Sequence, residues 1–199
     1  MKDSNQNSRT ALYNIYNRLL HAALDGTDRE CCVPKLMKTL DEIGFFEARC
    51  GRHHLFAGGT AQHCLEVALH AQRDPFASKV DRGSLLIVNL LHDVCDSRGR
   101  RDIGSGHHGE RSVQLIKEVA DFPLKKEESN AIRHHMHYLQ KLVNCCNSVD
   151  ELCFTMNNGI WHLQRFYDMM STRKSKQGRS PDINDLQSLV EELSRSPKL

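Results

Sequence analysis

An apolar run that ends in two polar residues constrains the fold of this chain most. Residues 85–91 read Leu-Leu-Ile-Val-Asn-Leu-Leu, and His92 and Asp93 follow directly. Neighbouring residues of a helix point about 100° apart around its axis, so a cation placed between His92 and Asp93 could contact both. Burying such a pair is costly unless something compensates it, and a divalent cation does so directly. The run therefore predicts a buried helix that ends at a metal-binding pair.

Other histidines are spaced so that they could join this pair. The chain has 12 histidines, and several stand out as His63, His107-His108 and His134-His135. These positions are internal and separate, which excludes a histidine tag. We therefore expect a histidine-rich metal site that is carried on helices.

Composition bounds the remaining possibilities. With 199 residues, 39% of them hydrophobic and 26% charged, the chain is most simply one soluble domain. The net charge of +2 gives no argument for a nucleic acid or a membrane surface as partner. No apolar stretch reaches the roughly 18 residues of a membrane span. Because the polar N-terminus lacks the apolar core of a signal peptide, we expect a cytoplasmic protein.

The cysteines favour free thiols over disulfides or a zinc ribbon. Of the eight, four form the vicinal pairs 31–32 and 145–146, which rarely bridge each other, and no Cys-x-x-Cys motif occurs. We expect most of the cysteines to be small buried residues in a reducing compartment.

Helical periodicity runs along the whole chain. Apolar residues recur every three or four positions, and no alternating strand pattern or internal repeat is present. The pattern predicts an all-α fold. The expected helices cover residues 11–23, 32–43, 61–69, 81–95, 109–120, 125–137, 149–171 and 182–193. Asp28, Thr60 and either Asp81 or Ser84 are the expected caps of the second, third and fourth helices. Residues 51–59 and 96–106 are expected to be loops, and residues 172–181 a basic flexible segment.

The order of the metal-capable residues resembles the HD-domain phosphohydrolase superfamily, in particular its small stand-alone members from bacteria and phages. The matching order is His63, His92-Asp93, His108, His135 and Asp168. The local matches are Gly-Gly-x-x-x-His at 58–63, Leu-Leu-His-Asp-x-Cys at 90–95, His-Gly-Glu-Arg-Ser-Val at 108–113 and Ala-Ile-Arg-His-His-Met at 131–136. The resemblance covers residues 52–172. It implies an HD metal-binding core at 52–172, N-terminal helices at 1–51 that pack on this bundle, and a basic loop and C-terminal helix of the same domain at 173–199.

The resemblance also implies a ligand set and a chemistry. A first metal would be held by His63, His92, Asp93 and Asp168. His108 and His135 would complete a second site with Asp93 as the bridge. Mixed imidazole and carboxylate ligands suit Fe, Mn, Zn, Co or Ni. With His92 and Asp93 as catalytic residues, a metal-activated hydroxide would cleave a phosphomonoester or phosphodiester, in a nucleotide or a related small phosphate.

Cationic and hydrogen-bonding residues near these motifs are candidates for substrate binding. They are Arg52, His54, Arg111 and Arg133, of which Arg133 could equally be a surface charge. His107 is expected to support the site from outside or to be exposed. In one departure from the family, Asp96 stands where a lysine often follows the catalytic aspartate, which reverses the local charge.

Two further functional classes remain open. The superfamily includes di-iron oxygenases, which the same ligand set would serve, and a degenerate HD module could act in binding or regulation. The intact ligand set argues against the latter. A nucleic-acid partner is not expected, because exoribonuclease relatives carry a separate nucleic-acid-binding domain. The oligomeric state is left open by the sequence.

Overall fold

The fold is all-α, as the periodicity predicts. The computed structural model describes residues 2–50, 54–96, 107–137, 142, 144–176, 187, 188, 190 and 191, and this part of the chain contains helices and turns but no strand. The helices are α1 (Lys2–Leu24), α2 (Val33–Glu42), α3 (Gly59–Arg73), α4 (Arg82–Leu91), α5 (His108–Gln114), α6 (Lys126–His134), α8 (Val149–Met156) and α9 (Gly159–Lys176). A π-helical turn, Leu115–Val119, continues α5.

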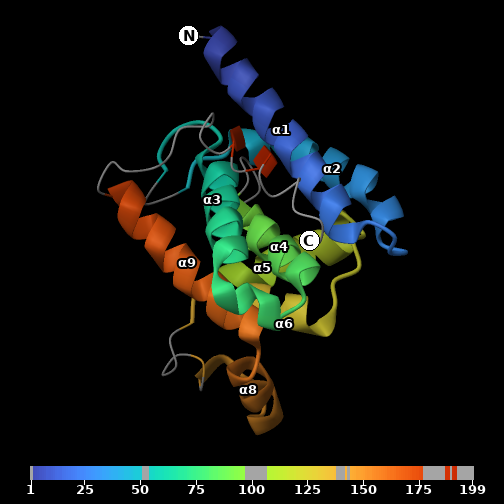
Figure 1. Cartoon of the computed structure of the whole chain (residues 1–199), viewed down its shortest axis with the longest axis vertical. Coiled ribbons are helices and arrows are strands. Elements are labelled where there is room, and N and C mark those ends of the chain that lie inside the picture. Colours follow the sequence, from blue (N-terminus) through green and yellow to red (C-terminus); the bar gives the residue numbers. More distant parts are fainter. Residues whose placement is uncertain are drawn as a thin grey trace.

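Helices α3 and α4 form the centre of the molecule (Figure 1). They pack against each other, and α9 packs on both of them and on α6. Helix α1 crosses α4 and α2, whereas α5 packs on α6. Helix α8 lies at the end of the molecule opposite α1 (Figure 1). No helix in the described ranges is long and apolar enough to cross a membrane.

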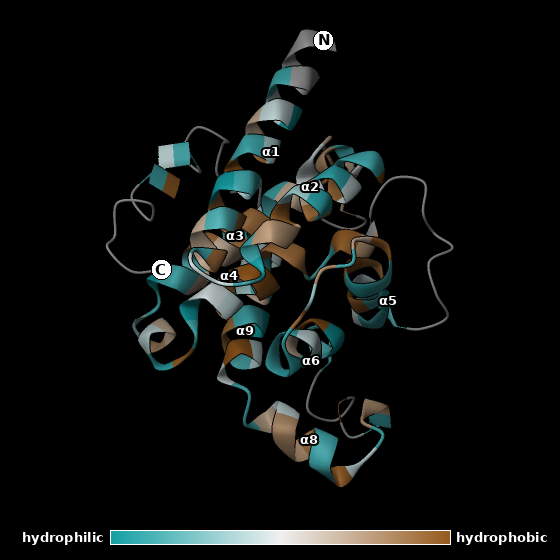
Figure 2. Ribbon diagram, turned by 90° about the vertical axis from the view of Figure 1, so that its right-hand side faces the viewer, coloured by the Kyte–Doolittle hydropathy of each residue, from teal (hydrophilic) through white to brown (hydrophobic). Residues whose placement is uncertain are grey.

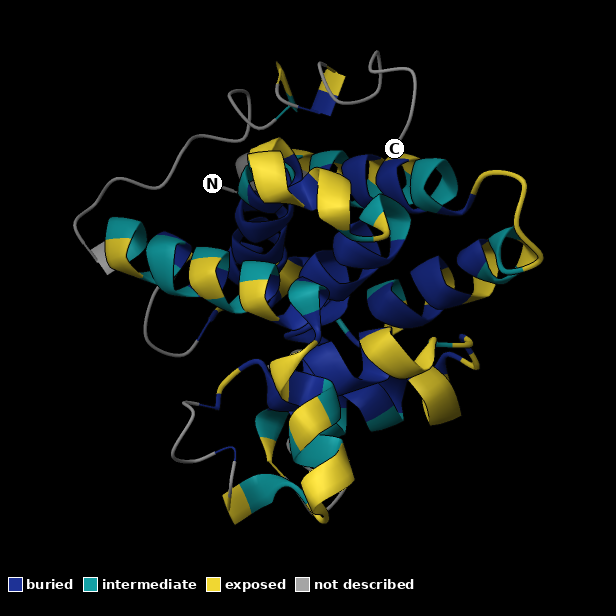
Figure 3. Ribbon diagram, turned by 60° about the horizontal axis from the view of Figure 1, so that its bottom comes forward, coloured by how far each residue is buried: buried dark blue, intermediate teal, exposed yellow. Residues whose placement is uncertain are grey.

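The apolar run identified in the sequence forms a buried helix at the molecule's centre. Every residue of α4 from Ser84 to Leu91 is buried. Hydrophobic and hydrophilic residues alternate along the helices (Figure 2), and the buried residues are concentrated in the helices at the centre (Figure 3). The Asp81 side chain caps α4 by accepting a hydrogen bond from the Ser84 backbone N–H, which confirms Asp81 as the cap. Burial of this helix fixes the position of the His-Asp pair that follows it.

Helix α4 ends earlier than predicted. Its last residue is Leu91, and a 3-10 turn over Val94–Asp96 follows, whereas the sequence predicted a helix as far as Cys95. The backbone N–H of Cys95 donates to Ser112 Oγ at 3.3 Å, so it is engaged by a partner outside its own helix. His92 and Asp93 therefore lie in the turn at the end of α4.

Two of the predicted caps were wrong. Helix α3 begins at Gly59, and Thr60 is a buried residue inside it. A Cβ atom at Gly59 would lie 1.9 Å from the carbonyl oxygen of His54, so only glycine allows the preceding chain to approach this closely. Helix α2 begins at Val33 after a short 3-10 turn, and the Asp28 side chain does not cap it.

The predicted helix over residues 149–171 is in fact two helices, α8 and α9. The Asn158 side chain accepts a hydrogen bond from the Ile160 backbone N–H and donates one to the carbonyl of Glu127. These contacts break the helix and tie the start of α9 to α6. The basic segment predicted to be flexible is helical up to Lys176, because α9 continues that far. Most of the helix predicted over 182–193 lies outside the described residues.

The cysteines are free thiols, as expected, but most of them are not buried. Only Cys50, Cys64 and Cys95 are buried, whereas Cys31 and Cys153 are exposed and the other three are intermediate. The prediction of small core residues was therefore wrong for five of the eight. One of the five, Cys145, lies beside two histidines, as described below.

Candidate metal centre

The structure brings all six of the predicted ligand residues together, and we call this group the inner cluster. Its members come from five helices or from the turns directly after them: His63 in α3, His92 and Asp93 after α4, His108 at the start of α5, His135 after α6, and Asp168 in α9. Five of the six residues are buried, and His108 is intermediate. The ligand atoms form overlapping groups of three that all lie within 4.8 Å of one another and could hold a metal ion.

Four imidazole Nε2 atoms face the single carboxylate of Asp93. The Nε2 atoms of His108 and His135 lie 2.6 and 3.1 Å from its Oδ1. Those of His63 and His92 lie 3.8 and 3.6 Å from its Oδ2. Each carboxylate oxygen therefore faces its own pair of histidines, which is the arrangement that a bridging carboxylate needs. Asp168 closes the group, with its Oδ1 3.1 Å from Nε2 of His63.

Two of these histidines are oriented by backbone carbonyl groups. Nδ1 of His92 donates to the carbonyl of Asn89 at 2.8 Å, and Nδ1 of His135 donates to the carbonyl of Ile132 at 2.7 Å. In the neutral ring this places the lone pair on Nε2. Both Nε2 atoms are buried and, among the described residues, neither meets a hydrogen-bond donor; each faces an oxygen of Asp93, which can only accept. Buried lone pairs without donors are costly, and a cation would satisfy them.

His63 is oriented by a chain of polar side chains. Ser171 Oγ donates to Glu66 Oε2 at 2.7 Å, and Nδ1 of His63 donates to Ser171 Oγ at 3.1 Å. The second oxygen of Glu66 contacts Nε2 of His54 at 3.0 Å. Since Ser171 uses its only proton on the carboxylate, it must accept from His63, and this directs Nε2 of His63 to the cluster.

His108 and Asp93 form the most strongly coupled pair. Burial lowers the pKa of His108, but the charge of Asp93 and the hydrogen bond to it outweigh burial and raise this pKa to about 12. Burial raises the pKa of Asp93, yet the nearby His92 and His108 hold it well below its usual range. The Sγ atom of Cys95 lies 3.3 Å from Nδ1 of His108 and orients the ring from its other side.

Burial dominates the pKa of His92, whereas ion pairing dominates the pKa values of His63 and Asp168. Burial lowers the pKa of His92 to about 4, so this ring is neutral at pH 7. Burial also lowers the pKa of His63, but the hydrogen bond to Asp168 and the charge of that residue outweigh it, and the pKa is raised. The same hydrogen bond holds the pKa of Asp168 below its usual range despite burial. His92 is thus neutral, as a metal ligand must be, whereas His108 would have to lose its second proton in order to ligate a metal.

Close packing of α5 on α6 brings His108 into the cluster. A Cβ atom at Gly109 would lie 2.3 Å from the carbonyl oxygen of Ile132 and 2.4 Å from that of Arg133. Only glycine lets the first turn of α5 approach α6 this closely. The glycine after His108 in the sequence motif therefore has a packing role that determines the position of His108 against Asp93.

The predicted substrate-binding residues lie in different environments. His54 is buried and lies next to His63, with ring centroids 5.2 Å apart. Arg111 follows His108 by three positions on α5, and its buried Nε meets no hydrogen-bond partner within the described ranges. Arg133 pairs with Glu110 and lines a groove of about 560 Å³ between α6 and α8, to which no member of the inner cluster contributes. Arg52 and the side chain of Asp96 lie outside the described residues.

Three residues that orient the cluster were not identified from the sequence. Besides Glu66 and Ser171, Arg165 donates to the carbonyl of His135 at 3.2 Å. Glu66 and Ser171 each follow a cluster residue by three positions, His63 and Asp168 respectively, and so lie on the same helix face. A polar residue one turn beyond a candidate ligand was thus a usable signal.

Comparisons with protein-family models, with curated proteins and with solved structures found no match.

Proposed function

We propose that this protein is a metal-dependent phosphohydrolase that cleaves a phosphomonoester or phosphodiester bond, in a nucleotide or a related small phosphate. One observation carries the proposal: four imidazole Nε2 atoms converge on the two oxygens of Asp93, and the buried Nε2 atoms of His92 and His135 meet no donor among the described residues. The ordered motifs that resemble the HD superfamily give the proposal its reaction class.

The residues divide into two ligand sets that share Asp93. His63, His92, Asp93 and Asp168 would hold one divalent metal, while His108 and His135 with the second oxygen of Asp93 would hold another. When bound, such metals would supply Lewis acidity and lower the pKa of a coordinated water to around 7. Imidazole and carboxylate together favour Fe, Mn, Zn, Co or Ni over magnesium.

The exposure of the side chains indicates from which side a substrate would reach the cluster. The side chains of His63, His92 and His135 are 0% exposed, whereas those of Asp168 and His108 are 12% and 24% exposed. A substrate would therefore approach from the side of His108 and Asp168, and the three enclosed rings would exclude water from the opposite side.

Arg111 is our candidate for the residue that binds the phosphate. It lies one turn after His108 on α5, and its Nε is buried without a hydrogen-bond partner in the described part of the chain. A guanidinium presents paired N–H donors that match two phosphate oxygens. Arg133 is less suited to this role because Glu110 already neutralises it.

The test combines metal content with hydrolysis. The wild type, His92→Ala, His135→Ala and the control His162→Ala, which removes an exposed histidine, would be loaded with Mn²⁺ or Fe²⁺ and analysed for bound metal. Hydrolysis of p-nitrophenyl phosphate, bis(p-nitrophenyl) phosphate and a nucleotide panel would be followed in parallel. We expect His92→Ala and His135→Ala to bind less metal than the control and to lose hydrolysis.

Two results would overturn the proposal. Metal content in His92→Ala equal to that of His162→Ala would show that the inner cluster does not bind metal. Iron binding accompanied by dioxygen consumption, without hydrolysis of any phosphate, would instead indicate the oxygenase class.

A further inference from the structure

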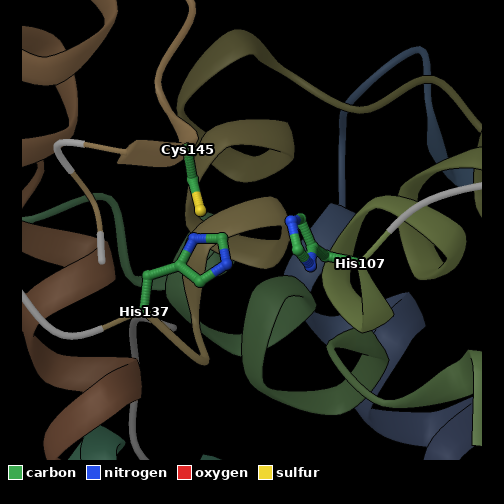
Figure 4. Close-up of side chains that lie close together, drawn as sticks. All are labelled: His107, His137 and Cys145. Carbon is green, nitrogen blue, oxygen red and sulfur yellow. The ribbon is translucent and has the colours of Figure 1, made fainter.

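A second group of metal-capable side chains lies outside the inner cluster. His107 precedes α5, His137 follows α6, and Cys145 lies in the connection between α6 and α8. One ligand atom from each lies within 4.8 Å of the other two. Figure 4 shows the thiol of Cys145 and both imidazole rings directed toward one another. We call these three residues the outer cluster.

The donor set of the outer cluster differs from that of the inner cluster. It combines two imidazoles with a thiol and contains no carboxylate, which is a set that suits Zn²⁺. In a tetrahedral zinc site with bonds of about 2.0–2.3 Å, ligand atoms lie roughly 3.3–3.8 Å apart. The three side chains would therefore need to move by about 1 Å or less to enclose an ion. A water molecule would take the fourth position.

A hydrogen-bonded relay orients His137 for this role. Nε2 of His134 donates to Glu151 Oε1 at 3.2 Å, because an ionised carboxylate can only accept. In the neutral His134 ring, Nδ1 is then the acceptor, and it receives a hydrogen bond from Nδ1 of His137 at 3.2 Å. The lone pair of His137 is thereby placed on Nε2. Carboxylate–histidine relays of this kind fix the tautomer of metal-binding histidines.

The outer cluster is more accessible from solvent than the inner one. His107 is exposed and Cys145 is intermediate, whereas His137 is buried. The imidazole rings of His107 and His137 lie at an interplanar angle of 89°, with their centroids 5.4 Å apart. An ion could therefore enter from the exposed side and be held against the buried ring.

We propose that His107, His137 and Cys145 form a second metal site, which takes Zn²⁺ or a similar borderline-soft divalent ion. The site is independent of the phosphohydrolase proposal, since it shares no ligand with the inner cluster. It would join the segment before α5 to the segment after α6. His107 adjoins His108, and His137 follows His135 by two positions. An ion at the outer cluster would therefore also stabilise the backbone that carries His108 and His135.

Cobalt binding tests the proposal without any measurement of activity. Thiolate-ligated Co²⁺ gives a charge-transfer band in the near ultraviolet, which imidazole and carboxylate ligands do not give. Co²⁺ titrations would compare the wild type with Cys145→Ser, and with two control variants. Cys146→Ser removes the adjacent thiol, and Cys95→Ser removes the thiol beside His108 in the inner cluster. We expect the band in the wild type and both controls, and its loss in Cys145→Ser.

A second variant distinguishes loss of the metal site from misfolding of Cys145→Ser. His107→Ala removes an exposed side chain and leaves the thiol in place, so Co²⁺ and Zn²⁺ should bind to it at least about tenfold more weakly. Circular dichroism would establish that each variant keeps its helices. The absence of a band from the wild type, its persistence in Cys145→Ser, or its loss in Cys95→Ser alone would overturn the proposal.

Discussion

The inner and outer clusters are built from neighbouring residues, yet they differ in burial and in ligand chemistry. His108 belongs to the inner cluster and His107 to the outer one, and the same alternation separates His135 from His137. The inner cluster is enclosed by five helices or helix ends and centres on the carboxylate of Asp93. The outer cluster is partly open and contains a thiol instead of a carboxylate.

This difference follows from where each backbone segment lies relative to the core. His108 is the first residue of α5 and packs toward α6, whereas His107 has an extended backbone (φ −66°, ψ 155°) and an exposed side chain. The imidazole of His107 is therefore exposed, although that of the next residue, His108, is directed toward the core. The same segment can thus supply two sites with different donors, which we expect to differ in metal preference.

The largest expected effect comes from the centre of the inner cluster. Asp93→Asn keeps the shape of the side chain but removes the negative charge that faces four imidazoles, so hydrolysis should fall by at least about 10²–10³-fold. In a Cys145→Ser background, which removes the outer site, metal content should fall as well. Atomic emission measurements and phosphatase assays would check both. Unchanged metal content would separate Asp93 from metal binding.

Gly109→Ala should affect both clusters together. The added Cβ would collide with the carbonyl oxygens of Ile132 and Arg133 and push α5 away from α6. Overpacking of this kind costs about 1–3 kcal/mol in the free energy of unfolding. Because His107 and His108 directly precede Gly109, metal binding at both clusters should weaken. Urea unfolding and metal titrations would be compared with Glu118→Ala, an exposed change in the π-helical turn that follows α5, and a weakening of one cluster alone would contradict the prediction.

Ser171→Ala should weaken metal binding at the inner cluster alone. It removes the acceptor that orients Nδ1 of His63, and loss of such a partner typically lowers metal affinity by about 10–100-fold. Ser171→Thr retains the hydroxyl and should restore most of the affinity. Isothermal titration with Mn²⁺ would measure the inner site, while the Co²⁺–thiolate band of the outer site should not change.

Glu151→Gln should have the converse effect. It removes the carboxylate that fixes the proton on His134 and, through it, the tautomer of His137. Affinity at the outer cluster should fall toward the lower end of the same range, about tenfold. Asp150→Asn, which changes the adjacent exposed carboxylate, serves as the control. A fall in Mn²⁺ affinity at the inner cluster would show that the two sites are not separable.

The smallest effect is expected at the cap of α4, which carries the inner pair. Burial raises the pKa of Asp81, but hydrogen bonds from Lys125 and Ser84 outweigh it and lower this pKa. A lowered pKa means that the ionised cap stabilises the fold above the unfolded value of about 3.9, and that this contribution is lost as the pH falls through the folded value. Asp81→Ala should cost about 0.5–2 kcal/mol at pH 7.

Unfolding experiments from pH 7 to pH 3 would check the sign of this effect. The stability difference between wild type and Asp81→Ala should shrink toward acid pH. Asp81→Asn keeps a capping oxygen without a titrating group, so its smaller deficit should change less with pH. A difference that grows toward acid pH would contradict the assigned pKa shift.

Local pattern was sufficient for most of the helices and for the six residues of the inner cluster. The periodicity of α1, α2 and α4 is a property of short segments, and the run before His92 already indicated that a buried helix leads to the metal-capable pair. The six residues that the ordered motifs named lie together, and glycines in those motifs, Gly59 before His63 and Gly109 after His108, allow the close packing around them. Their role as metal ligands stays a prediction.

Features that depend on contacts between residues distant in the sequence could not be predicted from local pattern. The break at Asn158 depends on the carbonyl of Glu127, and the orientation of His63 depends on Ser171, 108 residues away. The sequence predicted that Cys145 is a small buried residue, and only the tertiary structure shows that it lies beside His107 and His137. The sequence indicated which side chains could bind a metal and which helix each of them lies in or adjoins. Which of them face the same point in space was decided by the packing of α3, α4, α5, α6 and α9, because helix periodicity specifies a face but not the partner that the face meets.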